Sequence, residues 1–342
     1  MQSGILRKIK AGIARESVYG VAETLPNIFS LGAVDFMAEE IVDKVENKAM
    51  LGSTYEVDKV RVTVKQAKIT MKIKLDEDIL PLLFLQNFSI SSEAVAGETA
   101  VWRHVMTYLH QNASGTGQSF TLFVDDPDLQ DEIYTGLRFE KFDSPIVMKD
   151  EVYLELSGVA NYPVAQAVTI PISASPNSFV GKHVVFQLAK IAEALATQPI
   201  LDLTLRHAYP LSGDETNFSL GNEGLTQLFT LAPKFGLEYK ALLSDYALRT
   251  LWADNEEVKA KVTMSDTSRF VTGSVASTRP SVIFEYPAGY LTADGFKREG
   301  GANDIRQQTI KILPVDDPAV ADSPLKITVV NAIEAYDIAE AS

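Results

Sequence analysis

Apolar and polar side chains alternate along much of this 342-residue chain, and this two-residue period constrains the fold more than any other feature. The clearest run extends from Val60 to Leu75, and its phase changes at Lys65-Gln66. Because successive side chains of a strand point to opposite faces, the alternation predicts half-buried strands and the phase change predicts a bulge or turn. The chain is therefore predicted to be mainly β. Shorter segments of the same kind are 120–124, 133–139, 152–156, 184–188, 201–205, 282–284, 309–313 and 325–329.

Two segments have a helical pattern instead, and each follows a predicted strand. Residues 75–87 have Asp76 or Asp78 as the candidate N-cap, whereas residues 243–255 have Ser244 or Asp245. We interpret the two segments as copies of one strand–helix unit, because they align at an offset of 168, close to half the chain. The matched pairs include Leu80 with Leu248, Leu83 with Leu251 and Phe84 with Trp252.

The length and the duplication together predict two domains, since a domain usually has about 150 residues. A run rich in proline and small residues lies near the middle of the chain and is typical of a linker. We expect four parts: an N-terminal arm at 1–26, a first domain at 27–165, a linker at 166–177 and a second domain at 178–342.

Composition and motifs argue against catalysis. The chain has no cysteine, which excludes a disulfide framework, a thiolate zinc site and a cysteine nucleophile. Its four histidines do not have metal-binding spacing, and the motifs of serine hydrolases, P-loop enzymes and dinucleotide-binding folds are absent. Carboxylate pairs suited to glycoside hydrolysis remain open among 45 acidic residues, but no pair stands out. We expect no catalytic, cofactor-binding or metal-ligating residues and no cofactor.

The charge distribution has two distinctive parts. The net charge of −14 disfavours tight DNA binding, which requires many lysine and arginine contacts to phosphates. The N-terminus is nevertheless basic, with Arg7, Lys8, Lys10 and Arg15 before the first acidic residue, and no apolar region of a secretory signal follows. No window is long and apolar enough for a membrane helix, so we expect no membrane insertion.

One stretch is strongly acidic. Its residues do not have the spacing of a calcium-binding loop, so we interpret it as an acidic surface turn. The acidic side chains are Asp125, Asp126, Asp128, Asp131 and Glu132.

Several short segments, in order, resemble the tail tube proteins of long-tailed bacteriophages. Residues 14–22 (ARESVYGVA) are similar to the start of such proteins, and 134–142 followed by 152–158 is similar to their paired strands, the second of which ends in glycine. The second half resembles the family again at 179–182, 201–207, 243–255, 308–312 and 325–331.

The resemblance implies two tandem β-sandwich domains, each with one flanking α-helix. Three copies would form a ring with six similar domains, and rings would stack into a hollow tube through which DNA passes without specific binding. The implied location is the virion tail, assembled in the host cytoplasm. Implied partners are other copies of the chain, the tail terminator, tail-tip proteins and the tape measure protein.

Within this hypothesis, two groups of residues are candidates for assembly and for the channel. The N-terminal group is expected to hold successive rings together and consists of Arg7, Lys8, Lys10, Arg15, Glu16 and Tyr19. The acidic residues between 125 and 132 are candidates for a repulsive channel wall or an exposed loop.

Two alternatives stay open. One is a β-sandwich module that decorates a virion and binds carbohydrate or a receptor, and aromatic side chains clustered in loops would favour it. The other is the inner tube of a contractile tail, although duplication favours a flexible tail without a sheath.

Overall fold

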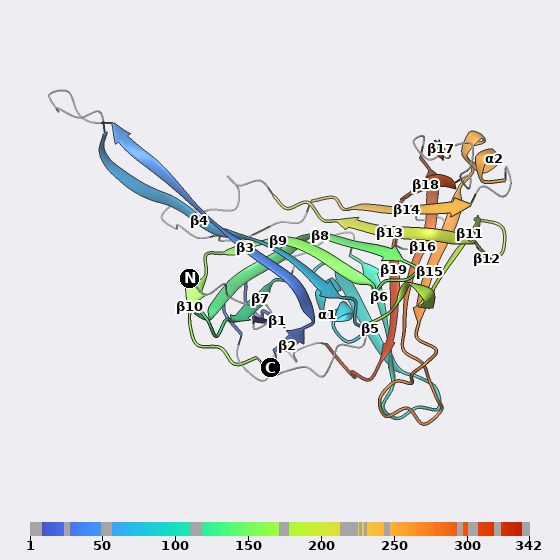
Figure 1. Cartoon of the computed structure of the whole chain (residues 1–342), viewed down its shortest axis with the longest axis horizontal. Helices are drawn as coiled ribbons and strands as arrows, with labels where there is room; N and C mark the ends of the chain where they lie inside the picture. The colour runs from blue at the N-terminus through green and yellow to red at the C-terminus, as the bar shows by residue number, and fades with distance from the viewer. Residues whose placement is uncertain are drawn as a thin grey trace.

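The structure, a computed structural model, describes residues 9–23, 28–48, 57–109, 118–170, 178–212, 225, 228, 231–242, 247–292, 297–299, 307–317 and 323–336. Strands make up 58% of it and helices 6%, which confirms the prediction of a mainly β protein. Every pairing between strands is antiparallel, and the 19 strands form one connected network (Figure 1).

The largest layer is a sheet of eight strands that runs through both halves of the chain. Its central contact is between β8 and β13, where Asp143 pairs with Arg206, so one strand from each half joins the sheet. The order across the sheet is β3 (Ala33–Lys48), β4 (Val57–Lys74), β9 (Tyr153–Asn161), β8 (Glu132–Val147), β13 (Ile200–Ala208), β14 (Lys234–Leu242), β18 (Gln307–Pro314) and β17 (Lys297–Glu299).

A second layer also combines strands of both halves. In it, β19 (Lys326–Asn331) lies between β16 of the second half and β6 of the first half. The order is β11 (Val184–Lys190), β15 (Val258–Ser265), β16 (Ser281–Leu291), β19, β6 (Trp102–Tyr108) and β5 (Phe88–Ala94), with β12 (Ala196–Thr197) beside β11.

The N-terminal strand lies inside a smaller sheet. β1 (Lys10–Arg15) pairs on one side with β2 (Phe29–Leu31) and on the other with β7 (Phe120–Asp125). The first part of β8 extends this sheet through β7, and β10 (Val164–Ala165) pairs with the same part of β8. The long strand β8 therefore connects this sheet to the eight-stranded sheet.

One hydrophobic core extends from β1 to the C-terminal residues and includes side chains of both layers. His207 on β13 contacts the ring of Phe284 on β16 at 5.7 Å between centroids, and its Nε2 lies 2.8 Å from the Tyr286 hydroxyl. Complete burial lowers the pKa of His207 to about 3, so the imidazole is neutral at physiological pH. His207 is therefore a core residue.

The two helices are shorter than predicted. The first, α1 (Leu80–Phe84), has five residues, and all of them are buried. The predicted helix at 75–87 is therefore too long, and it was wrongly expected to flank the sheets. Its N-cap residue is Ile79; Asp76 accepts from the backbone N–H of Asp78 instead, in a turn before the helix. The second, α2 (Ala247–Ala253), packs partly buried Trp252 against the core, whereas Ser244 and Asp245 lie outside the described residues.

All the predicted strands are present, and so is a bulge near the predicted phase change. In the pairing of β3 with β4, Asp43 lies opposite Val64 but the next residue, Lys44, lies opposite Val62, so Thr63 is the extra residue of a bulge. This bulge is two residues from the predicted phase change at Lys65-Gln66. At Gln66 the strand β4 begins to pair with β9. Before that point, β3 and β4 pair only with each other and extend from the body as a two-stranded ribbon (Figure 1).

The order of elements recurs along the chain. A strand pair, a short helix and a second strand pair appear as β3, β4, α1, β5 and β6, and again as β13, β14, α2, β15 and β16. Of the predicted linker, residues 166–170 follow β10 without regular structure, and 171–177 lie outside the described residues.

Candidate assembly surfaces

One face of the eight-stranded sheet is polar across strands of both halves. On β4 the residues Ile69, Met71 and Ile73 are buried, whereas the alternate residues, which include Lys68, Lys72 and Lys74, point to the opposite face. On the neighbouring strands, residues opposite the buried ones are also mostly apolar and residues opposite the lysines are often charged. The sheet therefore has an apolar inner face and a charged open face. The open face includes Asp35, Glu39, Lys68, Lys72, Lys74, Lys141, Asp143, Glu155, Asp202, Arg206, Lys234, Glu238, Lys240 and Lys311.

Cations and carboxylates on the open face form pairs, three of them across neighbouring strands and one, Lys141 with Asp143, within β8. The Lys72 ammonium lies 3.4 Å from the Glu155 carboxylate, and Lys141 lies 2.8 Å from Asp143. On the second half, Arg206 lies 3.3 Å from Glu238, and Lys240 lies 3.3 Å from Asp202. Such exposed pairs add little stability. The charged side chains named on this face are eight basic and six acidic, so the face is close to charge balance although the whole chain is acidic.

The sheet ends on one side in the long free strand β3 and on the other in the three-residue strand β17. Within the described part of the chain, β3 pairs only with β4, and β17 pairs only with β18, whose residues Ile312–Pro314 pair on that same side with β16 of the second layer. The free side of β3 is about 50 Å long at about 3.3 Å per residue. Unpaired N–H and C=O groups along such an edge are a template for pairing with another chain.

The ribbon formed by β3 and β4 has apolar side chains that no third strand covers. Val45 and Val60 are each about half exposed. A two-stranded ribbon is only marginally stable by itself in water. Its sequence is also asymmetric, because β3 has five acidic and two basic residues whereas β4 has one acidic and six basic residues.

The N-terminal candidate residues are described from Lys10 onward, and they belong to the body of the protein. Lys10 forms an ion pair with Asp125 at 3.3 Å, and Arg15 is the last residue of β1. Arg7 and Lys8 lie outside the described residues. Since four of the six residues of β1 are buried, the described part of the predicted arm is an inner strand.

Glu16 is buried and organises the turn that follows β1. Its carboxylate accepts from the Ser119 hydroxyl at 2.5 Å and the Thr121 hydroxyl at 3.0 Å, and from the backbone N–H groups of Gly20 and Gly136. Both glycines have positive φ values, which a residue with a side chain would rarely adopt. Burial raises the pKa of Glu16, and these hydrogen bonds oppose the rise.

Tyr19 lies beside a buried arginine of β8. The Arg138 guanidinium is 5.8 Å from the centre of the Tyr19 ring and donates to the backbone oxygen of Leu228. Burial lowers the pKa of Arg138 to about 10, and the nearby Glu16 opposes the shift. Glu16 and Tyr19, both predicted as assembly residues, are thus brought together inside the protein.

The acidic candidate residues form the turn between β7 and β8, apart from the open face. Asp131 accepts from the backbone N–H groups of Asp126 and Val168, and Asp126 accepts from the N–H of Asp128. The Tyr134 hydroxyl donates to Glu132. With Asp125 paired to Lys10, these carboxylates stabilise a turn, and neighbouring Leu129 is 87% exposed.

A group of carboxylates that sequence analysis did not identify as a site lies between β4 and α1. Asp76, Glu77 and Asp78 have oxygens within 4.8 Å of one another. Arg269, from the loop after β15, binds both oxygens of Glu77 at 2.6 and 2.8 Å and also contacts Asp266. The guanidinium thus joins two loops that are remote in sequence, which only the folded chain reveals.

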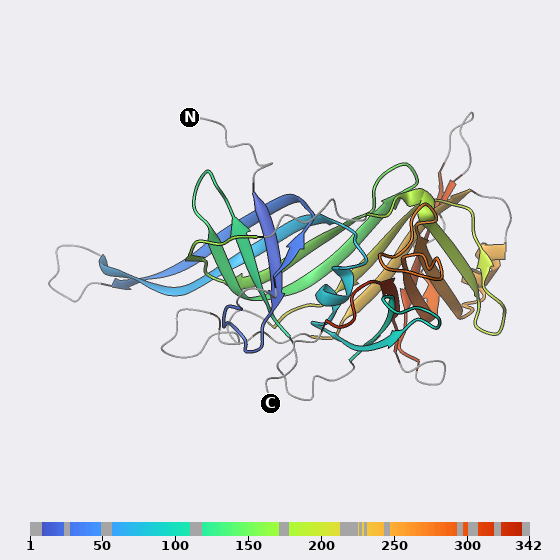
Figure 2. The ribbon, with the colours of Figure 1, turned by 90° about the horizontal axis from the view of Figure 1, so that it is seen from below.

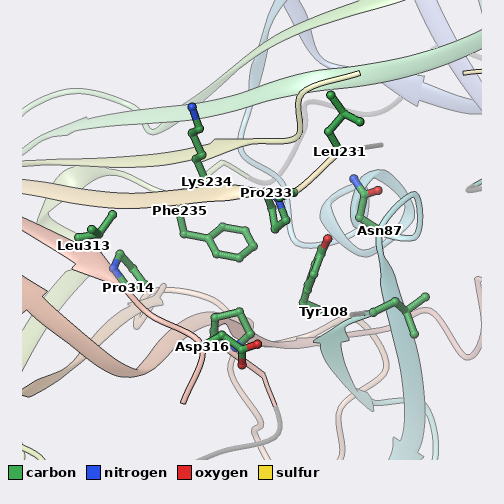
Figure 3. Close-up of a pocket in the computed structure, with 12 residues that line it drawn as sticks. Asn87, Tyr108, Leu231, Pro233, Lys234, Phe235, Leu313, Pro314 and Asp316 are labelled. Carbon is green, nitrogen blue, oxygen red and sulfur yellow. The ribbon is translucent and has the colours of Figure 1, made fainter. Parts of the chain in front are cut away.

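A pocket of about 570 Å³ lies where β6, β14 and β18 approach one another (Figure 3). Its aromatic side chains are Tyr108 and Phe235, whose ring centroids are 5.6 Å apart. Leu231 and Leu313 lie at the pocket and are each about half exposed, and Asp316 also lines it. The pocket is therefore mainly apolar with acidic and basic groups beside it.

The chain matches no known family, and no curated protein is similar to it in sequence. Within the described residues, both helices are far too short to cross a membrane.

Proposed function

We propose that this protein is a structural subunit of a long-tailed bacteriophage tail, in which copies of the chain form rings that stack into the hollow tail tube. The observation that carries the proposal is the eight-stranded sheet, which has the long free strand β3 at one end, the short strand β17 at the other, and a charged open face. Edge pairing between copies would extend this sheet around a ring, and rotational symmetry would close it.

The size of such a ring suits a channel for DNA. Three copies would make a barrel of 24 strands, and at about 4.8 Å per strand its backbone diameter is about 37 Å before strand tilt widens it. The inner wall would be the polar open face, because the apolar face is buried in the core. This leaves a channel wide enough for a duplex.

The recurring order of elements supports two tube domains in each chain. Four strands of the sheet come from each half, and β8 joins β13 at the junction. If the four strands of each half form one sector of the ring wall, three subunits give a ring with six similar sectors. The shared second layer and the continuous core then fix the two sectors relative to each other.

The charge of the open face revises the expectation that DNA would pass a repulsive, acidic channel wall. Cations such as Lys72 and Arg206 have carboxylate neighbours at 3.3–3.4 Å. DNA binds tightly where many cations neutralise phosphates and release counterions. A wall of balanced pairs lacks such a concentration of positive charge, so DNA slides past it without requiring net repulsion.

Electron microscopy of the purified protein tests the proposal. Across a range of salt and protein concentrations, we expect rings or tubes with a central channel and threefold symmetry. Compact monomers under all conditions, including the presence of tail-tip proteins, would exclude a tube subunit and leave a monomeric binding module as the better interpretation.

A further inference from the structure

The residues that follow β19 form a short segment that lies across the first half of the chain. We call it the Tyr336 strap and define it as residues 332–336. The strap is not part of any strand or helix, and its dark red trace lies beside α1 in Figure 2. Tyr336 is only 4% exposed, and its ring stacks on Phe29 of β2 with 6.2 Å between centroids. One buried aromatic side chain thus anchors the strap.

Hydrogen bonds hold the strap on the turn between β4 and α1. The Tyr336 hydroxyl donates to the backbone oxygen of Asp78 at 2.8 Å. The side-chain amide of Asn331, the last residue of β19, donates to the backbone oxygen of Glu77 at 2.8 Å and to the Tyr336 hydroxyl at 2.6 Å. The position of the strap therefore depends on the conformation of this turn.

This turn concentrates negative charge. Asp76, Glu77 and Asp78 have carboxylate oxygens within 4.8 Å of one another. The Arg269 guanidinium binds both oxygens of Glu77 and also binds Asp266, so its positive charge is shared between carboxylates. Neighbouring carboxylates disfavour one another's ionised form. A proton on Asp78 relieves this repulsion while the turn stays buried.

Asp78 retains a proton near neutral pH. Burial, followed by the negative charges of Asp76 and Glu77, raises the pKa of Asp78 to about 7, and Arg269 opposes the rise. The pKa of an aspartate in water is near 3.8. Between these two values a hydrated Asp78 is ionised, whereas a buried Asp78 is protonated. Any movement that brings water to Asp78 is therefore increasingly favoured as the pH rises from about 4 to about 7.

Two titratable side chains of the strap and its anchor do not change charge near pH 7. His104 lies against Tyr336 with 5.0 Å between ring centroids, and burial lowers the pKa of this histidine. Burial raises the pKa of Tyr336, so its hydroxyl stays protonated. The strap also carries Glu334, which is exposed. The charged and titratable groups that face Asp78 or its neighbours are Asp76, Glu77, Asp266, Arg269, Tyr336 and His183, which lies 3.5 Å from Asp266.

We propose that the Tyr336 strap is a pH-dependent latch, docked on the turn while the Asp78 carboxyl is protonated and detached once this carboxyl ionises. Detachment breaks the hydrogen bond between Tyr336 and Asp78 and lets water reach the carboxylate. The strap opens before the rest of the protein because no strand pairing holds it. Its release uncovers the Phe29 ring on β2. The latch does not rest on the proposed assembly into a tube.

Hydrogen–deuterium exchange of the full chain, read by mass spectrometry of the peptide that contains the strap, tests the latch. Each exchange rate is divided by that of the same peptide unfolded at the same pH, which removes the intrinsic effect of pH on exchange. Opening should be about 100-fold more frequent at pH 8 than at pH 5, because pH 5 lies two units below the pKa of Asp78 near 7 and each unit is a factor of ten. The peptide of β9 should stay protected at both pH values, which separates local opening from unfolding. Equal protection of the strap at pH 5 and pH 8 would overturn the proposal.

Asp78→Asn cannot ionise, so its strap should be protected equally at pH 5 and pH 8. The matched control is Asp150→Asn, which should keep the pH dependence because Asp150 is exposed. Both variants should keep one cooperative melting transition. A pH dependence that persists in Asp78→Asn would assign the effect to another group, such as His183, and would overturn the proposal.

A third variant tests the contact between the strap and the turn. Tyr336→Phe keeps the anchoring ring but loses the hydroxyl that donates to Asp78. Its strap should therefore open more often than that of the unsubstituted protein at both pH values. Unchanged exchange in Tyr336→Phe would contradict the latch.

Discussion

The Glu98 carboxylate accepts a hydrogen bond from the Ser274 hydroxyl at 2.6 Å and thereby joins a loop of the first half to a loop of the second half. The donors at this site stabilise the charged form, with Ser274 and Thr278 contributing most, and lower the pKa of Glu98 to about 2.

This pKa predicts how stability depends on acid. A carboxyl group whose pKa falls on folding stabilises the protein above its unfolded pKa, near 4.5, and loses that contribution as the pH falls toward 2. Urea unfolding between pH 6 and pH 2 should therefore show a loss of stability that is smaller in Glu98→Gln. An identical pH dependence in both proteins would contradict the assignment.

Glu16→Gln should destabilise the protein by about 1–3 kcal/mol, because an amide N–H₂ would replace an oxygen that accepts from buried donors. The matched control is Glu93→Gln, whose side chain is exposed and paired with Arg103 on the surface, and it should change stability by less than about 0.5 kcal/mol. Chemical denaturation at pH 7 measures both. Equal effects of the two substitutions would show that Glu16 does not organise the N-terminal turn.

Asp78→Asn should stabilise the protein above neutral pH. Burial, followed by the nearby carboxylates of Asp76 and Glu77, raises the pKa of Asp78 to about 7. A raised carboxyl pKa favours folding in full below the unfolded pKa near 3.8, and this contribution is lost as the pH rises through 7. At pH 8 we expect a gain on the order of 1–3 kcal/mol. Exposed Asp150→Asn is the control, and an equal gain there would refute the explanation.

Shortening the ribbon should separate assembly from folding. Replacing residues 44–63 with an Asn-Gly turn keeps Asp43 opposite Val64. It removes only residues of the ribbon in which β3 and β4 pair with each other and with no third strand. The free energy of unfolding of the monomer should change by less than about 1 kcal/mol, whereas rings or tubes should be lost in electron micrographs. Normal tubes from the shortened chain would show that the ribbon is not an assembly element.

The alternation of side chains predicted strands wherever one face is buried, as in β4 and β18. It failed for β1 because both faces of this strand are buried: Ala11 and Ile13 lie in the main hydrophobic core, and Ala14 packs in a second cluster with Ile28 and Ile170, so the strand shows no two-residue period. The basic N-terminal sequence therefore predicts an arm, whereas residues 10–15 form an inner strand.

The prediction of the first helix was wrong for a related reason. The run around Leu80–Phe84 is apolar on all sides because it is buried on all sides, and the polar residues after it do not face water. Gln86 instead donates to the backbone oxygen of Phe139 at 2.8 Å and accepts from its N–H at 2.7 Å. Such a contact depends on the position of β8, which local sequence cannot predict.

The candidate surfaces were harder to predict than the strands. The acidic run from Asp125 to Glu132 predicts a turn, but it does not show which groups the carboxylates accept hydrogen bonds from, such as the backbone N–H of Val168 for Asp131. Glu98 and Asp316 had no distinguishing motif, and only the fold places Glu98 beside Ser274. The balanced pairs of the open face depend on strand register, which sequence analysis did not predict for β9 and β13.

The mass of a single ring tests the central claim most directly. Native mass spectrometry of rings released from assembled protein should give three times the chain mass of 37.4 kDa, in accord with eight strands contributed by each of three copies. A ring of six copies, or only monomers where assembly is expected, would contradict a channel built from three two-sector subunits.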